Sequence, residues 1–380
     1  MVRDVGSGRS YRPGMVTVSR ILVVGAGIAG LATAVALQRR GFTPEIVEAR
    51  AAPSAEGAAI TLHGNGVRAL RALGVGPGLD AAGAVVPHWA CHDRHGALLC
   101  RTDLAALWDG VAPCIGITRN LLTGILLGAA AQVPLRFGCR VTGLRQDDRR
   151  VRVAFGDGSC GDYDLVVGAD GICSTVRRLA VSDVVPTRTP TVGWRCVVAG
   201  RPAGVEHLVL LLGEGCFLGL VPVGGGQTYG FAGTSAADAP LQDRFADFGG
   251  PVPDFLTRLD DTTAPHVAPI GFVTLDRWHD RRVVLVGDAA HATHPHMGQG
   301  GSLAVEDALV LADELARADT LPSALSANTR RRRPRVDWVQ EQSRRAAAAW
   351  AQPAAERDAT LRANGDRLLQ ERYRLLRDLP

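Results

Sequence analysis

A glycine-rich turn between an apolar segment and a helix-like segment constrains the fold of this chain most. Residues 21–24 read Ile-Leu-Val-Val, a run typical of a buried strand, and residues 28–40 have the apolar spacing of a helix. Gly25, Gly27 and Gly30 stand between and within them in the pattern G-x-G-x-x-G, and a second short apolar strand follows at residues 45–47. This order predicts a β-α-β unit with parallel strands, and therefore an α/β fold.

Each glycine in this motif has a physical purpose. The first allows a tight turn, the second lets the backbone approach a pyrophosphate, and the third lets the helix pack closely on the strand. Glu48 lies 18 residues after Gly30, where an acceptor for ribose hydroxyls is needed. The unit therefore predicts a dinucleotide site, although by itself it does not distinguish FAD from NAD. The expected contacts are Gly25, Gly27, Ile28, Ala29, Gly30, Glu48 and Ala49.

Two later segments favour FAD. Residues 164–171 read DLVVGADG, and residues 282–291 read RVVLVGDAAH. In each, a buried strand ends at a glycine next to an aspartate, and ligands bind at such strand ends in open α/β sheets. A domain that binds only NAD has no need of these two extra turns, whereas Asp288, after Gly287, could accept hydrogen bonds from the ribityl hydroxyls of FAD.

The rest of the chain predicts an insertion and a tail. Short strands separated by turns fill residues 191–233, a pattern typical of an antiparallel sheet, and residues 323–379 are helical and rich in arginine. We therefore expect a Rossmann-like FAD-binding domain with an inserted antiparallel-sheet substrate domain and a C-terminal helical segment, preceded by a loose tail at residues 1–15. The predicted FAD domain comprises residues 16–75, 101–180 and 275–322, the substrate domain 76–100 and 181–274, and the C-terminal helices 323–380.

Composition removes several classes of protein. All 42 basic residues are arginine, so no side-chain amine can form a Schiff base or serve in a P-loop. Eight cysteines without a C-x-x-C pair favour reduced thiols in a cytoplasmic protein and give no metal site. Dispersed arginines argue against a nucleic-acid partner. The uncharged stretch 21–37 is explained by the strand, turn and helix, so we expect no membrane partner.

The three motifs occur in an order that resembles the single-component FAD-dependent aromatic hydroxylases, the family of p-hydroxybenzoate and salicylate hydroxylases. The likeness covers residues 21–344 and includes Asn65 in HGNGVRALRALGV and the segment RPRVDWVQEQSR at 333–344. It implies a monooxygenase that uses NADH or NADPH and dioxygen. Such an enzyme hydroxylates or epoxidises an aromatic or polycyclic small molecule through a flavin hydroperoxide. The expected assembly is a monomer or homodimer, and a role in secondary metabolism is consistent with the composition.

The resemblance also implies roles for individual residues. Glu48 would hold the adenosine ribose, and Arg50 and Arg119 would contact the phosphates or the ribityl chain. Asp170 and Arg177 would serve the region where the pyrophosphate and the nicotinamide cofactor meet.

The glycine-rich segment 295–301 precedes a long helix. Its backbone N–H groups and the helix dipole would stabilise the negative charge of reduced flavin. Ser302 stands where many members of the family have asparagine. The expected cofactor contacts in this part of the chain are Gly287, Asp288, Pro295, Gly298, Gly300, Gly301 and Ser302.

Catalytic and substrate-binding residues are less clearly marked. By resemblance, Pro295 lies near the reacting oxygen, and His294 or His296 either donates a proton there or bonds nearby backbone. Trp194, Phe217 and Tyr229 lie on predicted strands and form either a wall for a planar substrate or ordinary core. Two other functions stay open, a flavin reductase of the same fold without oxygen insertion and a non-catalytic FAD-binding protein. A flavin halogenase needs a lysine, which this chain lacks.

Overall fold

The computed structural model describes residues 18–53, 58–234, 240–260, 263 and 265–380, so the tail expected at residues 1–15 lies outside the described part. The glycine motif folds as predicted, with β1 (Ile21–Val24), α1 (Ile28–Arg39) and β2 (Pro44–Val47). Both strands belong to a six-stranded sheet in the order β18-β19-β12-β1-β2-β8, with only β18 antiparallel to its neighbour. The other strands are β8 (Leu135–Arg136), β12 (Leu165–Gly168), β18 (His279–Asp280) and β19 (Val283–Leu285).

The pairing of this sheet brings three separated segments to one edge. Val24 at the end of β1 pairs with Val47 on one side and Gly168 on the other, and Gly168 pairs with Leu285 of β19. Because these strands are parallel, the turns after β1, β2, β12 and β19 all emerge at their carboxyl ends. The three motifs recognised in the sequence therefore meet in space.

Helices cover the six-stranded sheet. α9 (Gly300–Arg317) packs against α1, α2 (Gly64–Ala72) and the C-terminal helix α10 (Leu321–Trp350), while α5 (Arg119–Ala129) packs against α1. Leu31, Leu311 and Val167 are among the fully buried residues of the core between them. Two small antiparallel sheets flank this core, one of β9 (Val141–Gln146), β10 (Val151–Phe155) and β11 (Cys160–Tyr163), the other of β3 (Ala59–Leu62), β4 (Ala84–Val85) and β7 (Ile115–Thr118).

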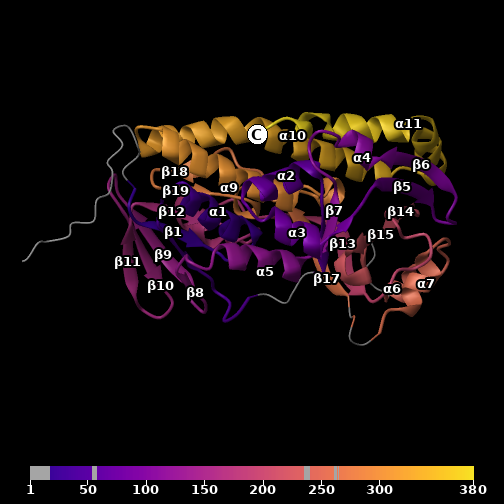
Figure 1. The fold of residues 1–380 in the computed structure, drawn as a ribbon, viewed down its shortest axis with the longest axis horizontal. Helices are drawn as coiled ribbons and strands as arrows, with labels where there is room; N and C mark the ends of the chain where they lie inside the picture. Colours follow the sequence, from indigo (N-terminus) through magenta and orange to yellow (C-terminus); the bar gives the residue numbers. More distant parts are fainter. Residues whose placement is uncertain (1–17, 54–57, 235–239, 261–262, 264) are drawn as a thin grey trace, which may run out of the picture.

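A seven-stranded sheet forms the other end of the elongated molecule, at the right in Figure 1. Its order is β17-β13-β16-β15-β14-β5-β6, and every pair is antiparallel except β14 with β5. The predicted antiparallel sheet is thus present, but the strand from residues 88–93 joins it in parallel, because it comes from an earlier part of the chain and not from a hairpin. The strands are β5 (His88–Asp93), β6 (Leu98–Asp103), β13 (Thr187–Val198), β14 (Leu208–Leu212), β15 (Cys216–Val223), β16 (Gln227–Thr234) and β17 (His266–Phe272).

The outer face of this sheet has its own small core. Short helices α6 (Leu241–Arg244) and α7 (Val252–Thr257) cover it, and Phe245 and Phe255 are fully buried there. Gly230 of β16 leaves the room that the Phe255 ring occupies, because a Cβ at this position would lie 2.2 Å from that ring. The opposite face of the seven-stranded sheet is therefore left to face the domain of the six-stranded sheet.

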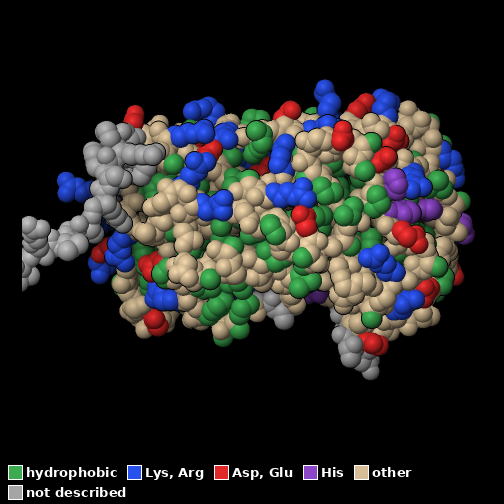
Figure 2. All heavy atoms as spheres, in the orientation of Figure 1, with side chains coloured by type: hydrophobic (Ala, Val, Ile, Leu, Met, Phe, Trp, Pro, Cys, Tyr) green, Lys and Arg blue, Asp and Glu red, His purple; other side chains and the backbone are tan. Residues whose placement is uncertain are grey.

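The chain ends in two long helices, α10 and α11 (Ala354–Arg374), which cross the top of the view in Figure 1. α10 packs on α9, which covers the six-stranded sheet, and α11 lies on β6 of the seven-stranded sheet. The two C-terminal helices together therefore extend over both sheets. Basic and acidic side chains are interspersed over the face shown in Figure 2. Among the described residues, no helix is both long enough and apolar enough to cross a membrane.

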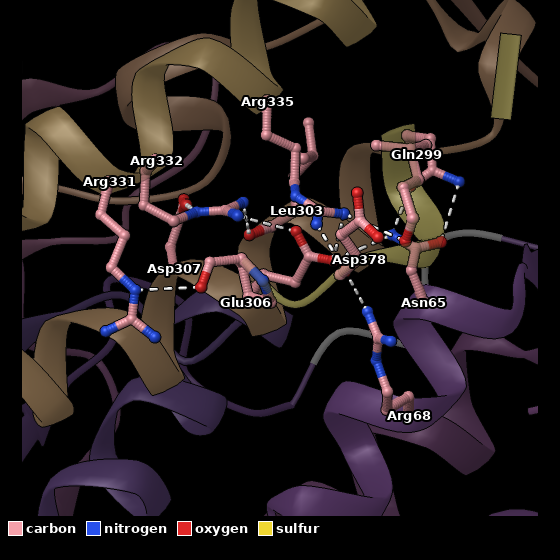
Figure 3. A network of polar contacts seen from close by, with 12 residues as sticks. Asn65, Arg68, Gln299, Leu303, Glu306, Asp307, Arg331, Arg332, Arg335 and Asp378 are labelled. Atoms are coloured by element: carbon pink, nitrogen blue, oxygen red, sulfur yellow. Dashed lines mark hydrogen bonds and ion pairs between the residues drawn. The ribbon is translucent and has the colours of Figure 1, made fainter. Parts of the chain in front are cut away.

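A buried network of charges fastens α10 to α9 (Figure 3). The Arg332 guanidinium donates to Glu306 and to Asp307, each at 2.7 Å, and all three side chains are almost fully buried. Asp307 in turn accepts from the backbone N–H of Gly287 at 2.9 Å and pairs with His291 at 2.6 Å. Burial alone would raise the pKa of Asp307, but His291 and Arg332 outweigh it and lower this pKa to about 2.

We expect Arg332→Met to lower the free energy of unfolding by about 3–5 kcal/mol, because it leaves two buried carboxylates without their cation. Arg345→Met on the same helix is the matched control, since Arg345 is exposed and its ion-pair partner in the described part of the chain is Glu341, one turn away. That change should cost about 0.3–0.5 kcal/mol. Urea denaturation of both variants measures the difference. Equal losses in the two variants would contradict the role given to the network.

Candidate active site

One continuous cavity of about 830 Å³ lies between the carboxyl edge of the six-stranded sheet and the inner face of the seven-stranded sheet. The turns after β1, β2, β12 and β19 line it, and so does the start of α9. The predicted residues that reach this cavity are Gly25, Gly27, Ile28, Ala29, Glu48, Ala49, Arg50, Arg119, Asp170, Asp288, Pro295, Gly298, Gly300 and Gly301, together with Trp194, Phe217, Tyr229 and His296.

The three motif glycines serve different ends. Gly25 has φ +107°, and a Cβ on it would lie 2.5 Å from the carbonyl oxygen of Ala169; a Cβ on Gly30 would lie 1.8 Å from the carbonyl oxygen of Gly25. Both are required by the packing of the protein itself. A Cβ on Gly27, in contrast, would meet no protein atom within 4 Å, although Gly27 lines the cavity. The space above Gly27 is open to a ligand at the positive end of α1.

Glu48 closes the turn from the side of β2. Its carboxylate accepts hydrogen bonds from the backbone N–H of Ala26 at 2.8 Å and of Arg50 at 2.9 Å. These bonds hold the carboxylate at the cavity wall, beside the guanidinium-bearing residues Arg50 and Arg119. A carboxylate oxygen has more than one lone pair, so Glu48 can also accept from a ribose hydroxyl.

The turn after β12 is built by its own polar groups. The Asp170 carboxylate accepts from the Ser174 hydroxyl at 2.5 Å and from the backbone N–H groups of Thr175 and Val176. Arg177 is buried and donates to the carbonyl oxygens of Ile172 and Ala289, and it does not line the cavity. The ligand-contacting role expected for Arg177 is therefore not supported; it links the turn after β12 to the turn after β19.

The turn after β19 presents a carboxylate to the cavity. Gly287 has φ +58°, and a Cβ on it would lie 2.9 Å from the Cβ of Ala29, so this position also serves close packing. The next residue, Asp288, has an exposed side chain that lines the cavity. His291 does not line the cavity and pairs with Asp307 instead, which gives it a structural role.

Hydrogen bonds from buried side chains fix the residues just before α9. Gln299 is fully buried, and its side chain bonds Asn65, which also donates to Glu306 at 3.0 Å (Figure 3). The Tyr373 hydroxyl of α11 donates to the carbonyl oxygen of Met297 at 2.8 Å. No sequence pattern indicated Tyr373, because its partner lies 76 positions away in the chain.

Ser302 and His294 differ from their predicted positions. Ser302 is fully buried in α9 and faces Gly66 of α2, where a Cβ would lie 2.2 Å from its hydroxyl oxygen, so the side chain does not line the cavity. His294 stacks on Phe272 with ring centres 4.7 Å apart, and it too is absent from the cavity wall. The position of Ser302 on α9 turns its side chain toward α2, and stacking on Phe272 holds the His294 ring outside the ligand space.

His296 does face the cavity. It lies 4.8 Å from the Trp350 ring and 5.8 Å from the Phe217 ring, measured between ring centres. Burial, with smaller contributions from His294 and Arg372, lowers the pKa of His296 to about 4. The imidazole is therefore neutral at pH 7, and a neutral imidazole carries one N–H donor and one acceptor.

The sheet supplies an aromatic wall. Tyr229 and Phe231 of β16 lie opposite Val197 and Arg195 of β13, so all four side chains share the inner face with Phe217. Trp194 alternates to the other face, where it belongs to the same buried cluster as Phe255 of α7, and it only borders the cavity. The prediction of a substrate wall thus has support for Phe217 and Tyr229 but little for the Trp194 ring.

Three wall residues had no signal in the sequence. Trp350 reaches the cavity from the end of α10, Trp89 from β5 and His63 from the residue before α2. Each comes from an element that looks like ordinary core or helix on its own. Only the folded chain brings them together.

These features define an FAD-binding site. The open space at Gly27, the carboxylates of Glu48 and Asp288 at different turns, and the glycine-rich start of α9 all line this one cavity. Such a series suits a long dinucleotide with a pyrophosphate and a hydroxylated chain. The aromatic wall adjoins the start of α9, where the ring end of FAD would lie.

Comparison with known proteins agrees with this site. The FAD binding domain family matches residues 18–227 and 259–343. A 3-amino-4-hydroxybenzoate 2-monooxygenase from Streptomyces cremeus is 35% identical over 91% of this chain and 92% of its own length. An aurachin C monooxygenase/isomerase from Stigmatella aurantiaca is 33% identical over 80% of this chain and 83% of its own length. The structure of Klebsiella pneumoniae HpxO complexed with FAD and uric acid superposes with a TM-score of 0.86 at 29% identity, covering 94% of this chain and 96% of that one.

The chain belongs to the single-component FAD-dependent aromatic hydroxylase family. The Rossmann-like domain with its inserted sheet and helical C-terminus is thereby confirmed, and so is FAD as the cofactor. The protein is an FAD-dependent monooxygenase.

We expect Gly27→Ala and Gly30→Ala to separate binding from folding. The Gly27 change puts a methyl group into the ligand space and meets no protein atom, so it should weaken FAD binding roughly tenfold or more while the melting temperature of the apoprotein stays the same. The Gly30 change forces a Cβ against the Gly25 carbonyl and should lower the apoprotein melting temperature. Flavin fluorescence titration and thermal unfolding measure the two effects. Loss of apoprotein stability in the Gly27 variant would argue against an open ligand space.

Proposed function

We propose that this enzyme uses NADH or NADPH and dioxygen to insert one oxygen atom into an aromatic or polycyclic small molecule. The observation that carries the proposal is an aromatic wall in the same cavity as the FAD-holding turns, next to the start of α9. Relatives that act on 3-amino-4-hydroxybenzoate and on urate support an aromatic substrate. The aurachin C relative is consistent with a step of secondary metabolism. We place the protein in the cytoplasm, with reduced thiols, as a monomer or homodimer.

Bound FAD would supply electron transfer from the nicotinamide cofactor and the activation of dioxygen. The chain holds and orients it: Glu48 at the turn after β2, Asp288 at the turn after β19, and the backbone of Gly300 and Gly301 at the positive end of α9. The α9 dipole favours negative charge at this place, which is what reduced flavin carries.

The cavity wall keeps water from the reaction site. Phe217, Tyr229 and Phe231 from the sheet face Pro295 and Trp350 from the helical side, and all five line the same cavity. Phe217 and Trp350 meet edge to face, with ring centres 5.0 Å apart. A dry site protects a reactive oxygen species from decay to hydrogen peroxide.

His296 is the hydrogen-bond donor and proton relay that this geometry favours. Its ring lines the cavity one residue after Pro295, and its Nδ1 has no hydrogen-bond partner among the described residues. Because its pKa is about 4, the ring is neutral at pH 7 and has one N–H and one acceptor nitrogen, so it can donate a hydrogen bond to the substrate side or relay a proton there.

Arg195 gives the wall one positive charge. It lies directly opposite Phe231 in the β13–β16 pair and within the cavity. Burial raises the pKa of the neighbouring Tyr229, while the charges of Arg195 and Arg119 oppose that rise. We therefore expect a substrate whose planar ring carries a carboxylate, a phenolate or a carbonyl oxygen that Arg195 can bind.

A substrate screen with labelled dioxygen tests the proposal. Aromatic acids and phenols that bind the site should accelerate the oxidation of NADH or NADPH, and one labelled oxygen atom should enter the product, as seen by mass spectrometry. Oxidation that accelerates without any labelled product would support a reductase instead. Bound flavin that neither nicotinamide cofactor reduces would support a non-catalytic FAD-binding protein.

We expect His296→Ala to lower product formation by about 10²-fold at pH 7, because the cavity loses its neutral hydrogen-bond donor and proton relay. His294→Ala is the matched control; its ring stacks on Phe272 outside the cavity, so its activity should stay within about twofold. Product per NAD(P)H consumed and bound flavin per chain are measured for both. Equal activity in the two variants would exclude His296 as the donor.

A further inference from the structure

Two cysteines face each other across the β5–β6 strand pair, away from the flavin-holding turns. Cys91 of β5 is in direct register with Cys100 of β6. Opposite residues in antiparallel strands have Cα atoms about 4.5–5.5 Å apart, which lies within the span that a disulfide bridges. Both thiols are free in this structure.

The two thiols differ in access and in acidity. Cys91 is only 8% exposed, whereas Cys100 is partly open to solvent. A hydrogen bond from the Cys91 thiol lowers the pKa of Cys100, and it raises the pKa of Cys91 together with burial. Among the charged groups of α11 near this pair, Arg372 favours the Cys100 thiolate and Asp366 opposes it. This is the arrangement of a reactive thiol beside a buried resolving thiol.

α11 packs closely over the pair. It lies over β6, and the Cys100 sulfur fills the place beside Gly365 that a side chain would take, since a Cβ there would lie 2.4 Å from that sulfur. Cys100 nevertheless keeps partial access to solvent. Trp89, two residues before Cys91 on the same side of β5, lines the cavity, so the pair lies on the same face of the sheet as the active site.

We propose that Cys91 and Cys100 form a peroxide-sensitive dithiol that closes to a disulfide. The Cys100 thiolate attacks one oxygen of hydrogen peroxide; an S–O bond forms, the O–O bond breaks, and the leaving hydroxide takes a proton to become water. The Cys91 sulfur then attacks the Cys100 sulfenic acid; the S–S bond forms, the S–O bond breaks, and a second water leaves. Two thiols are oxidised and one peroxide is reduced.

Under the proposed function, peroxide would arise whenever reduced flavin reacts with dioxygen without product. The dithiol itself does not depend on that source. The test therefore uses added hydrogen peroxide on the full-length protein, so that its outcome is independent of turnover.

Peptide mapping gives a direct readout. Because the chain lacks lysine, trypsin cuts after Arg94 and Arg101 and places Cys91 in the peptide 72–94 and Cys100 in the peptide 95–101. After peroxide treatment and alkylation of remaining thiols, we expect a linked peptide lighter by two hydrogen atoms than the sum of the two, lost on treatment with dithiothreitol. Recovery of both peptides unlinked, under conditions that oxidise the exposed Cys160, would overturn the proposal.

Three variants assign the roles. In Cys91→Ser, dimedone should trap a sulfenic acid on Cys100, whereas in Cys100→Ser the Cys91 peptide should stay unlabelled. Cys160→Ser, a change at an exposed thiol, should form the linked peptide as the parent does. Labelling of Cys91 in the Cys100→Ser protein would overturn the assignment of Cys100 as the reactive thiol. Bound flavin and circular dichroism confirm that each variant is folded.

Discussion

The buried contact of Arg332 with Glu306 and Asp307 is the interaction on which the site depends. Through Asp307 the network holds the backbone N–H of Gly287, and through Glu306 it holds Asn65, which in turn holds Gln299. Two cavity-facing turns from distant parts of the chain are thus fastened to one set of charges. Buried charges persist only when they are paired and hydrogen-bonded, and here each partner also positions backbone that would contact FAD.

Parallel strand pairing does the remaining assembly, and this part could be predicted from the sequence. A glycine or an acid after a β-branched run marks the carboxyl end of a strand, and parallel strands place all such ends at one edge. Gly27, Glu48 and Asp288 therefore reach one cavity although they span most of the FAD-binding segments. The presence of the inserted antiparallel strands could also be predicted, because turns separate them in the sequence. Their order could not, since β13 pairs with β16 and β17 and not with the next strand β14, and β5 joins the sheet in parallel; no local signal marks which edge a distant strand joins.

Side-chain direction and long-range partners could not be predicted. Because side chains alternate along β13, either Trp194 or Arg195 must face the cavity. Only the folded structure shows which one: Trp194 belongs to the buried cluster of Phe255 on the outer face, so Arg195 faces inward. In the same way, His294 and His296 flank Pro295 symmetrically in sequence, and the stacking of His294 on Phe272 separates them. The partners of Arg332 lie 25 and 26 positions away, beyond any pattern of helix or strand.

Different structural elements would hold the cofactor and the substrate in this cavity, which explains how one fold can serve different aromatic substrates. FAD would be held by backbone at glycine turns and by carboxylates at strand ends, all of which the six-stranded sheet and α9 position. The substrate would meet side chains from other elements: Phe217 from β15, Tyr229 from β16 and Trp350 from α10. These side chains come from elements other than the six-stranded sheet, although Phe217 and Trp350 also contact His296 next to the start of α9. The helical tail is the exception, because it both supplies Trp350 and, through Tyr373, braces Met297 beside His296. Changes in the tail should therefore alter substrate fit and proton delivery together.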